Sequence, residues 1–300
     1  MSDPELIPVT SLDPTPGLVR ENPMIWTGEE QPRGVFLDAG ETDDALALLG
    51  MPSMLRPATP RLPVGFEPGP LLRGRLEQLR RAVASAAAGG DGHTLEMVDL
   101  DADSRQSLLE MLGEGEVSGS VTLDGVRYTI TESVLPGVWH LTGSDGSQYL
   151  EVASIPSVIT RAAASLRKAP LPLPPGGPGV MNAPALLAEI NQHAAAWHPG
   201  IEHNRVLNFT LLPTSEADQQ MLIDVLGRAE LVLDSGGFGN CRVMATTVRH
   251  VWAVQYVNGM GKTIMDTIEI GRIPDAALAA RQDLEDSAER LAEILETYLA

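Results

Sequence analysis

The sequence lacks long apolar runs, a secretory leader and paired cysteines, and each absence excludes a class of protein. No stretch approaches the about 20 consecutive apolar residues of a membrane-spanning helix, so we expect no membrane insertion. The first residues, Met1-Ser-Asp-Pro-Glu, are acidic and have no apolar core, which argues against a secretory signal. The single cysteine, Cys241, excludes an intramolecular disulfide and fits a reducing cytoplasm.

Basic residues are also few, with 21 Lys and Arg against 40 Asp and Glu, and the formal net charge is −19. This balance argues against nucleic acid as a partner, because phosphate binding needs clustered Lys and Arg. An acidic chain would instead attract a basic partner segment through long-range electrostatics. Alternatively, the charge serves solubility alone.

An internal repeat organises the chain, whose 300 residues match the length of about two domains. Residues 103–113 are similar to residues 217–227, and the same landmarks follow each stretch in the same order. These landmarks are a glutamate, an arginine in a strand-like run, a Val-Trp pair and a closing segment: Glu116 and Glu230, Arg127 and Arg242, Val138-Trp139 and Val251-Trp252, 150–156 and 268–274. The repeat indicates two copies of one module, so a feature present in only one copy is a candidate for a special function.

We therefore predict a proline-rich, acidic N-terminal arm at 1–69, module one at 70–167, a Pro/Gly linker at 168–180 and module two at 181–300. The arm has scattered apolar residues that build no core, which predicts an extended segment. The prolines of the linker favour a semi-rigid spacer. Helix and strand periodicities predict an α-β-α-β-β-β-α order in each module. The fold class is α+β, with mainly antiparallel sheets and the helices on one face.

Several motifs that suggest chemistry do not fit their known contexts. Residues 259–263 end like a phosphate-binding loop, but position 256 is Tyr rather than Gly, and a hairpin turn fits better. Residues 236–239 form a tight turn rather than a dinucleotide fingerprint. One thiolate cannot hold an iron–sulfur cluster, so Cys241 is interpreted as a small buried hydrophobe. Spacing suggests no catalytic triad, metal site or cofactor, and we expect no enzyme; Trp139 and Trp252 favour core packing.

Two groups of residues remain as candidates for binding a partner. Glu114 and Glu116 lie between glycines at a helix end, where the helix dipole disfavours carboxylates, so a turn and a binding surface both stay open. The second group lies in module two, in and after its glycine-rich turn and before its Val-Trp pair: Phe238, Asn240, Arg242, Arg249 and His250.

Four stretches, at 112–118, 212–218, 248–252 and 283–291, resemble the HupH/HyaF/HoxQ family of hydrogenase expression/formation proteins. The resemblance runs from about residue 70 to the C-terminus and keeps the order of all four stretches. It implies a non-catalytic cytoplasmic chaperone for maturation of nickel–iron hydrogenases. The implied partner is the immature iron–sulfur small subunit, bound before assembly and Tat export, and other hydrogenase accessory proteins are further candidates.

Charge connects this resemblance to particular residues. A Tat signal has a cationic twin-arginine region, which Glu114 and Glu116 could contact. Two alternatives stay open: an iron–sulfur cluster carrier for the same subunit, and a small-ligand-binding protein that uses a cleft between the modules.

Overall fold

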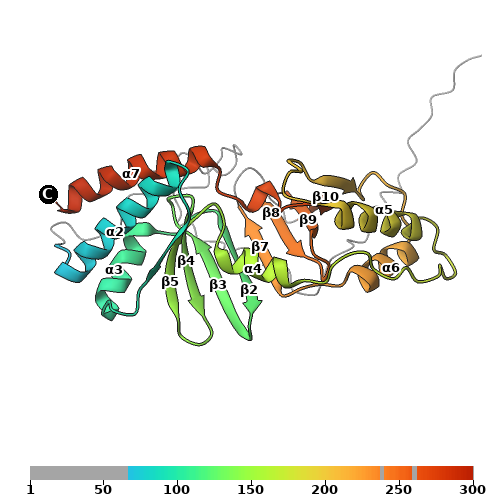
Figure 1. The fold of residues 1–300 in the computed structure, drawn as a ribbon, viewed down its shortest axis with the longest axis horizontal. Helices are drawn as coiled ribbons and strands as arrows, with labels where there is room; N and C mark the ends of the chain where they lie inside the picture. Colours follow the sequence, from blue (N-terminus) through green and yellow to red (C-terminus); the bar gives the residue numbers. More distant parts are fainter. Residues whose placement is uncertain (1–66, 237–239, 259–261, 300) are drawn as a thin grey trace, which may run out of the picture.

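The computed structural model describes residues 67–236, 240–258 and 262–299, which form a ten-stranded antiparallel sheet with helices packed against it (Figure 1). The strand order is β1-β5-β4-β3-β2-β7-β8-β9-β10-β6. The bounds of the strands are β1 His93–Glu96, β2 Val117–Leu123, β3 Val126–Glu132, β4 Val138–Gly143, β5 Gln148–Val152, β6 Arg205–Asn208, β7 Leu231–Ser235, β8 Asn240–Ala245, β9 Val251–Val257 and β10 Thr263–Ile270. The N-terminal arm, except for its last three residues, and Phe238 lie outside the described residues.

The helices are α2 Pro70–Ala87, α3 Ala102–Leu112, α4 Ser157–Ser165, α5 Ala183–Ala196, α6 Glu216–Leu226 and α7 Arg281–Leu299, with a short 3-10 helix, η2, at Asp275–Ala277. The α+β class and the antiparallel pairing are confirmed. Within the described ranges, no helix is long and apolar enough to span a bilayer.

The strand order is symmetric about the β2–β7 contact, where the first half of the sheet (β1 to β5) joins the second half (β6 to β10). The two halves also share a register: Val138 pairs with Val152 between β4 and β5, and Val251 pairs with Ile270 between β9 and β10. That the halves are copies of one module stays an interpretation. Positions in the two halves can nevertheless be compared through this shared register.

Two details of the predicted module were wrong. Each half has four strands after its second helix rather than three; in the first half, residues 117–132 form two strands that turn at Asp124-Gly125, where both φ values are positive. The sheet is also a single one, because β2 and β7 pair along five residues from Val117↔Ser235 to Val121↔Leu231.

The expectation that the helices cover one face of the sheet was also wrong. In β4, Val138 packs with α2 and α3, whereas its neighbour Trp139 packs with α4. Since successive strand residues point to opposite faces, α4 lies on the other face. There, α4 and η2 cover the centre of the sheet, while α5 and α6 cover the second half on the first face. Some strands are therefore buried on both faces, as the run of buried residues Val251–Gln255 shows. An alternating pattern of apolar and polar residues cannot predict such a strand.

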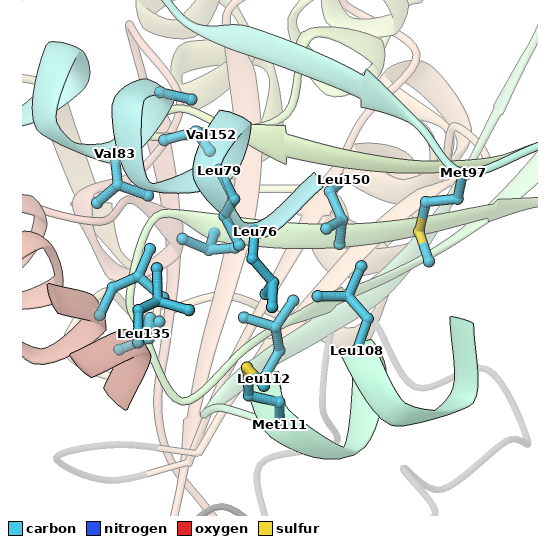
Figure 2. Packing of buried hydrophobic residues seen from close by; sticks show 14 of the residues in the cluster. Leu76, Leu79, Val83, Met97, Leu108, Met111, Leu112, Leu135, Leu150 and Val152 are labelled. Atoms are coloured by element: carbon cyan, nitrogen blue, oxygen red, sulfur yellow. The ribbon is translucent and has the colours of Figure 1, made fainter. Parts of the chain in front are cut away.

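The C-terminal helix α7 crosses back to the first half of the molecule. Figure 1 shows it beside α2, and the side chains of Leu284, Leu291 and Leu295 join the core formed by α2, α3, β4 and β5. Figure 2 shows this core, in which Leu76 and Leu79 of α2 face Leu150 and residues of α3. Burial of these aliphatic side chains ties the C-terminal helix to the N-terminal half of the described chain.

Asp218, the last residue of the 212–218 stretch, has a structural role. Its fully buried carboxylate accepts hydrogen bonds from the backbone N–H groups of Met181, Asn182 and Ala183 at 2.8–2.9 Å. It also accepts the N–H of Ser215, completing a capping box at the start of α6. Desolvation alone would raise the pKa of Asp218, but the N–H donors outweigh it and lower the pKa to about 2. One side chain thereby fixes the starts of α5 and α6.

The linker contacts the second half. Leu171 is buried in the core of that half, and both its N–H and its carbonyl bond to the side chain of Asn191 in α5. This part of the predicted linker therefore packs as a strap against α5.

Candidate functional site

The described candidate residues fall into two groups on opposite faces of the sheet. Asn240 and Arg242 lie on the face that carries α2, α3, α5, α6 and α7, as the alternation and register of β7 and β8 show, and Glu114 and Glu116 belong to the loop that connects α3 of that face to β2. Arg249 and His250 line a pocket on the other face, beside α4. The structure therefore does not bring the two groups together in one site.

Glu114 and Glu116 form an exposed acidic loop between α3 and β2. The glycine between them has a folding role: the N–H of Gly115 donates to the carbonyl of Glu132, and a side chain at position 115 would overlap Ser133. The carbonyl of Glu116 accepts the N–H of Gly236 next to β7. The glycine thus explains the turn, and the two carboxylates face solvent at the junction of the two half-sheets.

A polar strip that no described helix covers lies beside this acidic loop, between the helices of the two halves. We call it the open strip; its members are Ser118, Ser120, Thr129, Asp234 and Arg242. Asp234 and Arg242 form an ion pair at 2.7 Å on adjacent strands. Ser118 and Thr129 are exposed, although both lie in central strands. Among the described residues, neither helix group covers this central strip.

His140 connects the acidic loop to this face electrostatically. Burial lowers the pKa of His140, and the carboxylate of Glu114 offsets part of that shift. Glu132, on the neighbouring strand, is almost fully buried, and burial raises its pKa to about 7 although the N–H of Gly137 donates to it. The charges of Asp283 and Glu116 add to the rise.

Arg249 and His250 lie in the tight connection between β8 and β9. His250 has a φ of 68°, a left-handed conformation that a non-glycine residue adopts at a cost. Its Nδ1 lies 3.3 Å from the carbonyl of Gly271, which can only accept, so Nδ1 is the protonated nitrogen. The N–H of Gly271 in turn donates to the carbonyl of His250. This reciprocal pair fixes the position of the imidazole.

A pocket of about 360 Å³ opens beside these residues, and we call it the indole pocket. The stacked rings of Trp197 and His250, with centroids 3.9 Å apart, form part of its lining. Trp252 and Arg249 also line it, as do apolar side chains of α4 and of the segment after β10. Both halves of the chain therefore contribute to its lining.

Three N–H donors of the indole pocket have no hydrogen-bond partner among the described residues: Trp197 Nε1, Trp252 Nε1 and Arg249 Nε. Trp252 is only 2% exposed, so water does not compensate its donor from bulk solution. Each unpaired buried donor costs about 1–3 kcal/mol of folding free energy. Buried polar groups in folded proteins are almost always paired, so three unpaired donors in one pocket require an explanation.

The first half of the molecule shows that the fold can satisfy such a donor. Trp139 corresponds to Trp252 by register, and its Nε1 donates to the carbonyl of Ala153 at 2.8 Å. The carbonyl that corresponds to Ala153 in the second half is that of Gly271, which accepts from His250 instead. The residue that corresponds to His250 is Gly137, with φ 82°. The second half thus has a histidine where the first half has a glycine.

Cys241 is buried, as expected, and burial raises the pKa of its thiol to about 12. A thiol in this state is neither a nucleophile nor a ready metal ligand. In the described part of the chain, no three His, Cys, Asp or Glu side chains lie together in an arrangement that could hold a metal ion.

Comparison with known proteins identifies the family. Residues 180–298 match the family described as HupH hydrogenase expression protein, C-terminal conserved region. The hydrogenase expression/formation protein HupH of Rhodobacter capsulatus is 39% identical over 85% of this chain and 92% of its own length. HoxQ of Cupriavidus necator is 38% identical over 84% of this chain and 92% of its own length.

The chain belongs to the HupH/HyaF/HoxQ family. The Escherichia coli hydrogenase-1 operon protein HyaF is a more distant member, 32% identical over 68% of this chain and 73% of its own length. A solved structure, the hydrogenase expression protein HupH from Thiobacillus denitrificans ATCC 25259, matches 40% of this chain and 97% of that chain at 24% identity, with a TM-score of 0.35. The resemblance deduced from the four stretches is therefore confirmed at the level of the family.

Sequence reasoning missed Trp197, which completes the indole pocket and follows α5 directly. It also took Trp252 as a core residue only; burial is confirmed, but its ring also lines the pocket. One signal in the sequence was available. Polar residues precede the Val-Trp pair in Arg249-His250-Val251-Trp252 but not in the matching Pro136-Gly137-Val138-Trp139.

Proposed function

We propose that this protein is an accessory chaperone in hydrogenase maturation that binds the immature iron–sulfur small subunit in the cytoplasm, before assembly and Tat export. Membership of a family of hydrogenase expression/formation proteins supports the general role. The binding role rests on one structural observation: an exposed acidic loop, Glu114 and Glu116, borders an uncovered polar strip of the central sheet.

A Tat signal is cationic near its twin arginines, whereas this chain has a net charge of −19. Long-range attraction between opposite charges raises the association rate, and carboxylates at the contact then select arginine-bearing segments. Because Gly115 fixes the backbone of the loop against Ser133, the two carboxylates are presented without an ordering cost for the turn.

The test is charge reversal with a matched control. The variant Glu114→Lys/Glu116→Lys changes the net charge from −19 to −15, since each substitution adds 2. The control Asp91→Lys/Glu202→Lys makes the same change at two exposed residues in loops before β1 and β6. Affinity for the purified small-subunit precursor is measured by calorimetry at low and high salt.

We expect the loop variant to bind the precursor at least about tenfold more weakly than the control, and to have a shallower salt dependence. Equal affinities of the two variants would contradict the proposed contact. Equal binding of the precursor and of a subunit without its signal peptide would limit the contact to the mature subunit.

The cluster-carrier alternative requires accessible sulfur or a group of ligands. The single thiol, Cys241, is buried and protonated at physiological pH. Anaerobic purification followed by iron analysis distinguishes the two functions, since a chaperone that captures the subunit without bound iron fits the first.

A further inference from the structure

We propose that the indole pocket is a binding site for a carboxylate attached to an apolar body. The inference goes beyond the proposed chaperone function and does not depend on the identity of the client. It rests on the unpaired donors of Trp197, Trp252 and Arg249, and on the way the second half of the fold leaves them unpaired.

The unpaired state of the Trp252 donor is specific to the second half. With glycine at position 137, the Trp139 donor reaches the carbonyl of Ala153. With histidine at position 250, the corresponding carbonyl of Gly271 accepts from the imidazole at 3.3 Å, and the Trp252 donor has no partner among the described residues. The second half thus has a side chain in a strained backbone conformation beside a buried indole N–H that no described residue accepts.

The first half of the molecule could not form such a pocket. A side chain at Gly137 would overlap Leu284 of α7, which covers that position. In the described part of the second half, Trp197, which follows α5, stacks on His250 instead, and residues of α4, including Thr160 and Ala163, line the same pocket. The pocket volume of about 360 Å³ is within the range of small-ligand sites.

The chemistry of the lining residues selects a hydrogen-bond acceptor with one negative charge. The unpaired groups are all donors, and no acidic side chain is among the lining residues. Arg249 has no ion-pair partner in the described part of the chain, whereas the other lining arginine, Arg272, pairs with Asp275 at 2.8 Å. Burial and the charge of Arg249 lower the pKa of His250, so the imidazole is neutral at pH 7.

One guanidinium and two indole donors match the two oxygens of a carboxylate, which together accept about four hydrogen bonds. A phosphate dianion would exceed the available positive charge, and a cation would find donors rather than ligands. The remaining walls are apolar or aromatic: Ile155, Ala163, Ile273, Leu278 and the Trp197–His250 stack. They suit an aromatic or branched aliphatic group next to the carboxylate.

A free organic acid and the C-terminal residue of a peptide both offer this chemistry. The experiment therefore uses both as probes against the full chain, with calorimetry and the fluorescence of the four tryptophans as readouts. Phenylacetate is compared with 2-phenylethanol, and the tripeptide Gly-Gly-Phe is compared with its C-terminal amide. Binding of phenylacetate and of the tripeptide indicates a general carboxylate site, whereas binding of one alone identifies the source.

We expect the alcohol and the amide to bind at least about tenfold more weakly than the matching acids, because a charged acceptor is replaced by a neutral group. Trp252→Phe and Arg249→Gln should each weaken acid binding by a similar factor. Trp139→Phe should leave it unchanged, since the Trp139 donor is already paired.

His250→Gly is the sharpest variant, because it recreates the arrangement of the first half. In this variant the carbonyl of Gly271 can accept the Trp252 donor as that of Ala153 accepts the Trp139 donor, and the ring that stacks on Trp197 is gone, so we expect acid binding to be lost while the protein stays folded. Absence of saturable binding by either acid, or equal binding of acid and neutral analogue, would overturn the proposal. Retained binding in His250→Gly and Trp252→Phe together would also overturn it.

Discussion

The two buried tryptophans allow a paired measurement of folding stability. Trp139 and Trp252 correspond by register and are 0% and 2% exposed, but only Trp139 has a hydrogen-bond partner. Replacing each by Phe removes the same indole N–H and a similar volume. The loss of packing is therefore shared, and the difference between the variants reports the hydrogen bond.

The expected magnitude follows from the state of each donor. Trp139→Phe leaves the carbonyl of Ala153 without its donor, which costs about 1–3 kcal/mol in addition to the packing loss. Trp252→Phe removes a donor that was buried without a partner, which recovers about 1–3 kcal/mol and offsets the packing loss. We expect Trp139→Phe to be the less stable variant by about 2–6 kcal/mol.

The assay is urea unfolding of both variants without ligand, followed by circular dichroism, with equal m-values as the condition for comparing midpoints. A difference below about 0.5 kcal/mol would refute the reasoning, because the two donors would then have equivalent environments. A larger loss in Trp252→Phe would show that its donor is paired in solution.

Three further predictions concern buried titratable groups. The pKa of Glu132 is about 7 in the folded state against an ordinary 4.5, so between these values the folded state holds a proton that the unfolded state has lost, and the free energy of unfolding falls as pH rises through that window. Glu132→Gln should remove this loss of about 3 kcal/mol. Urea unfolding of both proteins at pH 5 and pH 8 measures it. Asp218 has the opposite sign: its folded pKa of about 2 is below the ordinary 3.8, so its contribution is present above pH 4 and is lost as pH falls through 2. Asp218→Asn should cost about 2 kcal/mol at pH 7 and little near pH 2, and equal costs at the two values would contradict the bonding described. The thiol of Cys241 should not react with a disulfide reagent at pH 8 until the protein is unfolded, and rapid reaction of the native protein would show that the thiol is accessible.

Much of the fold could be predicted from the sequence because its elements have strong local signals. The helix ending at Leu112 stops at Gly113, whose φ is 59°, and the helix ending at Leu226 stops at Gly227, whose φ is 61°. Glycine is favoured there because it adopts positive φ without strain. The antiparallel hairpins likewise follow from turn residues between alternating strands.

Tertiary relations were less predictable, since they depend on pairs of residues distant in the chain. The sequence of α4 has an apolar side but does not say which face of the sheet it covers, and the β2–β7 contact joins strands more than a hundred residues apart. The position of α7 over the first half was also not predictable from its own pattern.

The candidate site was predictable only in part for the same reason. Arg249 and His250 stood out as residues of one half, and both line the indole pocket. Trp197 joins them only through folding, because it lies more than fifty residues earlier in the chain. The unpaired state of the Trp252 donor is a property of the folded side-chain positions, and no sequence pattern encodes it.

The most direct test of the proposed function is capture of the full chain, with its bound partners, from cells that express a hydrogenase operon with the small subunit either carrying or lacking its signal peptide. We predict that the small-subunit precursor is the main protein recovered, and that deletion of the signal peptide strongly reduces its recovery. Recovery of the large subunit alone, or of no hydrogenase subunit, would contradict the account.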